Sequence, residues 1–64
     1  MGLLGREVIG KPCVVKTART HYVGTVVGYM FKSGNYEVRI NQTVKGTMKP
    51  GRTITVKGTD VYPV

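Results

Sequence analysis

The stretch Tyr22-Val-Gly-Thr-Val-Val-Gly-Tyr-Met-Phe31 decides the fold of this 64-residue chain. It is rich in β-branched and aromatic residues, which are typical of strands. Gly24 and Gly28 lie four residues apart, and therefore on the same face of an extended strand. Glycines in such positions allow a strand to bend sharply, as a small barrel requires. The stretch therefore predicts one long, strongly bent strand.

Further short strands are expected on both sides of this one. Residues 36–41 and residues 52–57 alternate between apolar and polar side chains, which predicts half-buried strands. Residues 32–35 read Lys-Ser-Gly-Asn, a composition typical of a hairpin turn. Residues 13–17 predict a strand, and residues 60–64 a 3₁₀ turn or terminal strand. The expected fold is all-β, a small SH3-like barrel of about five short, strongly bent antiparallel strands.

The chain is expected to divide into an N-terminal piece and one barrel domain. Residues 1–11 are predicted to form an arm or short strand, because Gly10-Lys11-Pro12 ends their apolar run. Residues 12–64 are predicted to form a single domain with one small core. Tyr36 and Tyr62 are expected to belong to that core. An apolar piece beyond a minimal barrel is a candidate protein-interaction surface, here made of Leu3, Leu4, Val8 and Ile9.

Charge gives the strongest functional signal. The chain has 10 Lys and Arg residues against 3 Asp and Glu residues, which gives a formal net charge of +7. A positive potential of this kind attracts polyanions, and nucleic acid is a common partner of a basic β-barrel. Cations that grip phosphates, together with rings that stack on bases, make up such an interface. The candidate nucleic-acid-binding residues are Lys16, Arg19, His21, Tyr22, Tyr29, Phe31, Lys32 and Arg39.

Composition also bounds the chemistry. The single cysteine, Cys13, excludes an internal disulfide scaffold and fits a reducing cytoplasm. The chain has no Cys-x-x-Cys, no pair of histidines and no Gly-rich phosphate loop leading into a helix. No run approaches the roughly 20 apolar residues of a membrane span. We therefore expect a cytoplasmic protein with no cofactor, no metal, no membrane partner and no active site within one chain, while a site shared between identical subunits stays open.

Residues 15–29 carry a first resemblance. They contain an apolar and basic strand, a short loop, an aromatic residue and Gly-x-Val before a bent strand. This order resembles the opening of an SH3-like barrel and is similar to the KOW motif of translation and transcription proteins. KOW domains bind RNA or protein, so the resemblance implies a binding module.

A second resemblance is carried by Lys16, Tyr22, Gly24, Val26, Val27, Gly28, Tyr29 and the ending Val61-Tyr62-Pro63-Val64. This pattern is similar to that of the plasmid-type (type II) dihydrofolate reductases, which are tiny SH3-like tetramers. Asp60 stands where that family has a glutamine in its central pore, and four such aspartates would repel an anionic folate. The resemblance therefore implies a shared barrel architecture, with reductase activity in a homotetramer as one alternative.

Three functions follow from these observations. The first is a small, basic, non-catalytic nucleic-acid-binding module for DNA or RNA, whose contacts go mainly to the phosphate backbone. The second is a protein-interaction module, such as a small phage or plasmid accessory protein that binds an acidic surface of a host enzyme and modulates it. The third is the reductase-like homotetramer. SH3-like barrels serve several of these roles, so the fold alone does not choose among them.

Overall fold

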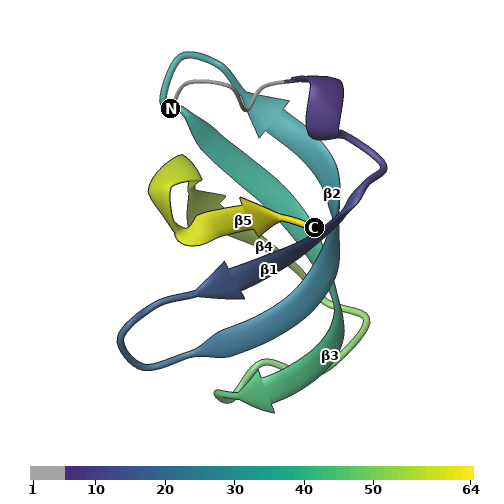
Figure 1. Ribbon diagram of the computed structural model, residues 1–64, viewed down its shortest axis with the longest axis vertical. Coiled ribbons are helices and arrows are strands. Elements are labelled where there is room, and N and C mark those ends of the chain that lie inside the picture. Colours follow the sequence, from purple (N-terminus) through teal and green to yellow (C-terminus); the bar gives the residue numbers. More distant parts are fainter. Residues whose placement is uncertain (1–5) are drawn as a thin grey trace.

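The computed structural model describes residues 6–64 (Figure 1). The elements of this part are η1 (Arg6–Val8), β1 (Pro12–Lys16), β2 (His21–Met30), β3 (Asn35–Lys45), β4 (Thr53–Lys57), η2 (Gly58–Asp60) and β5 (Val61–Pro63). The five strands form one antiparallel sheet in the order β4-β3-β2-β1-β5, which confirms the predicted small all-β class of bent antiparallel strands. The strands β4 and β5 lie at the two edges, and no ladder of hydrogen bonds joins them within residues 6–64, so the sheet is open.

The long hairpin of β2 and β3 forms the central part of the sheet and curves strongly (Figure 1). A Cβ atom on Gly24 would collide with the carbonyl oxygen of Arg39 and lie 2.8 Å from Cγ1 of Val38. Only glycine therefore allows β3 to approach β2 this closely. The pairing of the two strands shifts register between Val23 and Gly24 and again between Val26 and Gly28. Such irregularities increase the local twist, which agrees with the bend expected from the two glycines.

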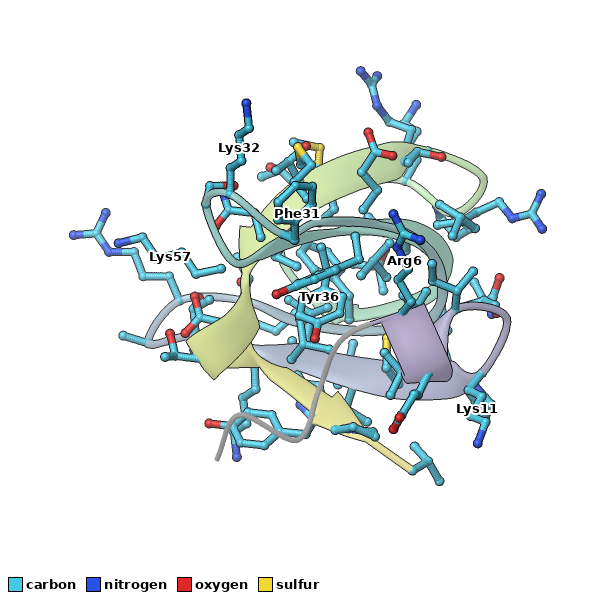
Figure 2. The ribbon with its side chains drawn as sticks, turned by 90° about the horizontal axis from the view of Figure 1, so that it is seen from above. Arg6, Lys11, Phe31, Lys32, Tyr36 and Lys57 are labelled. Atoms are coloured by element: carbon cyan, nitrogen blue, oxygen red, sulfur yellow. The ribbon has the colours of Figure 1, made fainter. Side chains whose placement is uncertain are left out.

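The core lies on the concave side of the bent sheet. Period-two alternation places Tyr36, Val38 and Ile40 of β3 inward, and all three are fully buried, as the sequence pattern predicted. Figure 2 shows Tyr36 at the centre of the molecule, surrounded by the strands. The remaining buried residues of the cluster are Val8, Cys13, Val15, Tyr22, Val26 and Val61.

Within the described part of the N-terminal piece, residues 6–8 form the short 3₁₀ turn η1 rather than a strand, and Val8 is buried in the common core. The amide of Gly10 donates to the carbonyl of Val26 at 2.7 Å, and the amide of Val26 donates to the carbonyl of Lys11 at 3.0 Å. Residues 6–11 are thus attached to β2 along its middle. Leu3 and Leu4 lie outside the described residues. No helix in the described part of the chain is long and apolar enough to cross a membrane.

Candidate nucleic-acid interface

A row of basic residues crosses three strands at one end of the sheet. Lys16 of β1 lies directly opposite His21 of β2, and His21 lies directly opposite Lys45 of β3. Directly opposite residues of antiparallel strands present their side chains on the same face. Neighbouring strands are about 4.8 Å apart, so the two lysines start about 10 Å apart with the imidazole between them. We call Lys16, His21 and Lys45 the basic row.

The basic row lies on the outer face of the sheet, the side turned away from the core. Burial alternates along β2, with Tyr22, Gly24 and Val26 inward, so that His21 faces outward. His21 is half-buried between its neighbours, whereas Lys16 and Lys45 are exposed. Two ammonium groups with an imidazole between them form a surface that suits an anion.

Arg19 joins this end of the sheet through the tight loop between β1 and β2. The hydroxyl of Thr17 accepts hydrogen bonds from the amides of Arg19 at 3.3 Å and Thr20 at 3.1 Å. The amide of Thr17 also donates to the carbonyl of Thr20 at 2.9 Å. These bonds close the loop immediately after Lys16 and leave the Arg19 side chain exposed. Lys16, Arg19 and His21, which the sequence singled out separately, are therefore neighbours in space.

Tyr22, predicted as an exposed nucleic-acid contact, is buried instead. Its ring is 3% exposed and lies in the core, so it is not available to stack on a base. Its hydroxyl accepts a hydrogen bond from the amide of Met48, and the Thr43 hydroxyl donates to the Met48 carbonyl. These two hydrogen bonds hold the loop of residues 46–52 in place beside the basic row. Tyr22 therefore positions a basic loop from inside the core.

Tyr62 is a surface residue that sequence reasoning placed in the core. The residue is 53% exposed, and its side chain lies on the outer face. It lies opposite Val14, which lies opposite Val23, one row further along the sheet from the basic row. Its neighbour Val61 is buried, and consecutive strand residues face opposite sides of a sheet. Placing Val61 in the core would therefore have predicted Tyr62 on the surface.

Arg39 lies on the same face, one row further still. It is paired with Thr25 of β2 and with Thr53 of β4, and it is exposed. The side-chain amide of Asn41 donates to the Thr25 hydroxyl at 3.0 Å beside it. We count the rows of directly opposite residues from the basic row, which is the first. The outer face then carries cations in the first and third rows and the exposed ring of Tyr62 in the second row.

The other predicted residues lie at the opposite end of β2. The strand β2 runs over ten residues from His21 to Met30, and the hairpin turn that carries Phe31 and Lys32 is at its far end (Figure 1). Phe31 is 67% exposed, and Figure 2 shows it beside Lys32 on this turn. The ring of Tyr29 is half-buried and packs against Tyr36, with ring centroids 4.7 Å apart. The sequence candidates thus form two clusters, with Arg39 between them along the sheet.

An open hollow lies beside Phe31 at this end of β2. Its lining is mostly apolar, and its cations come from the 3₁₀ turn η1 and from the hairpin turn, so separate parts of the chain build it. Figure 2 shows the labelled Arg6, Phe31 and Lys32 on one side of the molecule. We call this surface the Phe31 hollow; its lining residues are Arg6, Tyr29, Met30, Phe31, Lys32 and Ser33.

The cations of both surfaces are open to solvent. All ten Lys and Arg residues lie within the described range and are exposed. Among residues 6–64, none of their side chains makes a hydrogen bond with another residue.

Residues 6–64 hold no group of three or more His, Cys, Asp or Glu placed to bind a metal. Burial raises the pKa of the Cys13 thiol above its usual value, which disfavours the reactive thiolate.

Comparison with known protein families, curated proteins and solved structures found no match to this chain. The resemblances to the KOW motif and to the type II dihydrofolate reductases therefore stay predictions.

Proposed function

We propose that this protein is a small, non-catalytic nucleic-acid-binding module whose contacts go mainly to phosphates. The observation that carries the proposal is the basic row, in which Lys16, His21 and Lys45 lie side by side across three strands. Exposed cations that have no carboxylate partner gain most from an external polyanion, because no internal ion pair must be broken first. Arg19 and Arg39 extend the same positive surface at its edge and along the sheet.

The mechanism is counterion release. Each phosphate neutralised by a lysine or arginine frees condensed counterions, which favours binding at low salt and weakens it at high salt. His21 adds a hydrogen-bond donor between the two lysines. Contacts of this kind fix the position of the nucleic acid without reading its bases, so weak sequence preference is expected on both DNA and RNA.

The direct test is fluorescence anisotropy with labelled single-stranded RNA, single-stranded DNA and duplex DNA, titrated at several salt concentrations. With Lys16, Arg19, Arg39 and Lys45 each on one phosphate, the duplex slope of log K against log salt should be roughly −3.6. Binding that is flat in salt would contradict a phosphate-dominated mechanism. An absence of binding to all three probes at low salt would overturn the proposal.

A second candidate function, protein interaction, is favoured by the Phe31 hollow. Met30 and Phe31 expose apolar surface there, and Arg6 and Lys32 flank it with positive charge. An acidic protein surface with one apolar side chain complements this arrangement in both respects. The test is affinity capture with the wild-type chain and Phe31→Ser as baits, with Val64→Ser as the matched control, because Val64 is also apolar and exposed. An acidic protein retained by wild type and V64S but lost by F31S would support this function, whereas equal retention by all three would contradict it.

A further inference from the structure

We infer that the outer face binds single strands in preference to duplexes, with Tyr62 as a stacking platform for one base. The inference rests on the proposed function, because it names the substrate class of that same surface. Its basis is the position of the Tyr62 ring, 53% exposed in the row between the basic row and Arg39.

The spacing of these groups suits a strand that crosses the sheet. Tyr62 is opposite Val14, and Lys16 is two residues further along β1 on the same face. Such diagonal neighbours lie about 7–8 Å apart. A phosphate held by Lys16 and a base stacked on Tyr62 are therefore within reach of each other in one short stretch of chain.

The third row lies further along the same face. Strands rise about 3.4 Å per residue, so Thr25, the partner of Arg39, lies about 14 Å along β2 from His21. Val14 and Val23, which are only partly buried, lie between the basic row and the row of Arg39, and Tyr62 lies in their row on the edge strand β5, next to Val14. A cation in the basic row with a neighbouring ring and partly apolar surface beside it matches a nucleic acid that alternates between phosphates and bases.

A duplex cannot use the ring in this way. Its base faces are covered by their stacked neighbours, and exposing one costs a few kcal/mol. Reading a duplex from its major groove needs an inserted helix or a two-stranded ribbon. The helical elements of residues 6–64 are two 3₁₀ turns of three residues each, and the Tyr62 ring lies on a sheet face rather than on a projecting element. The ring therefore contributes to binding only where bases are unpaired.

The experiment measures the affinity of one labelled oligonucleotide as a single strand and as a duplex, in both DNA and RNA form. Wild type should bind the single strand more tightly at equal salt. Tyr62→Leu should weaken single-strand binding by roughly 5- to 150-fold, the range for removal of one base–aromatic stack. Duplex binding and the salt slope should not change, because no phosphate contact is removed.

Two controls separate stacking from other effects. Tyr62→Phe keeps the ring and should bind single strands within about twofold of wild type. Phe31→Leu removes the more exposed ring at the far end of β2 and should also leave single-strand binding unchanged. Equal or tighter binding to the duplex, or single-strand binding by Y62L equal to wild type, would overturn this inference and leave the proposed function standing. Failure of wild type to bind either form would overturn both.

Discussion

The backbone amide of Met48 donates a hydrogen bond to the hydroxyl of Tyr22 at 3.3 Å, across 26 positions of the chain. The Tyr22 ring is part of the core, while Met48 belongs to the loop that follows the basic row. The position of that loop is therefore coupled to the packing of the core. A substitution of Tyr22 in the core should therefore alter the loop beside the basic row.

Tyr22→Phe should lower the free energy of unfolding by about 0.5–1.5 kcal/mol, the usual net value of one hydrogen bond. Urea denaturation measures this change, and amide hydrogen exchange at Met48 should become faster. Tyr62→Phe is the matched control, because the Tyr62 hydroxyl makes no hydrogen bond within residues 6–64 and its loss should change stability by less than about 0.5 kcal/mol. Equal stability of the two variants would contradict a stabilising role for the Tyr22 hydroxyl.

Gly24→Ala should destabilise the fold by about 1–3 kcal/mol, the typical penalty of overpacking. The new methyl group would collide with the backbone carbonyl of Arg39, which cannot move without disturbing the sheet. Gly28→Ala is the control within the same strand, because its methyl group would meet the end of the flexible Glu37 side chain at 2.6 Å. Chemical denaturation should rank G24A well below G28A, and the reverse ranking would show that the close approach at Gly24 is not essential.

Lys16→Gln and Lys45→Gln should each make the salt slope shallower by roughly 0.9 on duplex DNA or 0.7 on a single strand. Under the proposed function, each variant removes one phosphate contact from the basic row. Lys57→Gln changes the formal charge by the same amount, but Lys57 pairs with Asn35 at the other end of β3. Anisotropy titrations across salt concentrations should give K57Q the wild-type slope. A slope that falls equally in all three variants would mean that net charge alone drives binding.

Cys13 should resist thiol reagents in the folded protein and react on unfolding. Its side chain is fully buried, and burial raises the pKa of its thiol above the ordinary value of about 9.0. The unfolded chain therefore loses this proton at lower pH than the folded one. Stability should be constant below about pH 8 and fall as pH rises through the unfolded value.

The pH dependence can be assigned to this thiol by substitution. Cys13→Ala lowers overall stability by leaving a small void, but it should remove the part of the fall that begins near pH 9. Burial, with a contribution from Tyr29, also raises the pKa of Tyr36 above its usual 10.0, so a second fall above pH 10 should persist in C13A. Denaturation curves measured from pH 7 to 11 check both steps, and an unchanged profile in C13A would refute the assignment to Cys13.

Several features of the fold follow from local patterns. The alternation in residues 36–41 correctly predicted Tyr36, Val38 and Ile40 as core, because a strand with one buried face must alternate. The hairpin turn before it was predictable from glycine and asparagine, and Gly34 has a positive φ of 73°. The strand itself extends to Lys45, beyond the predicted end at Asn41, because its second half pairs with the start of β2.

The residues predicted to bind nucleic acid do not all lie together. Lys16, Arg19 and His21 lie together because a tight loop joins neighbouring strands, which sequence proximity already suggested. Phe31 and Lys32 lie far from them because β2 runs the length of the sheet. Tyr22 lies in the core and Tyr62 on the surface, the reverse of what was predicted. Aromatic residues suit both a core and a solvated surface, and only the phase of the alternation separates the two.

The sequence by itself determined the strands, the turns and the positive charge, because these depend on side-chain type and on the two-residue repeat of an extended chain. The tertiary structure decided which charges meet. Lys45 reaches His21 only through register shifts in the β2–β3 ladder, and Tyr62 reaches the outer face only because β5 pairs with β1. Register and strand order depend on contacts between residues distant in the chain, so no local pattern contains them.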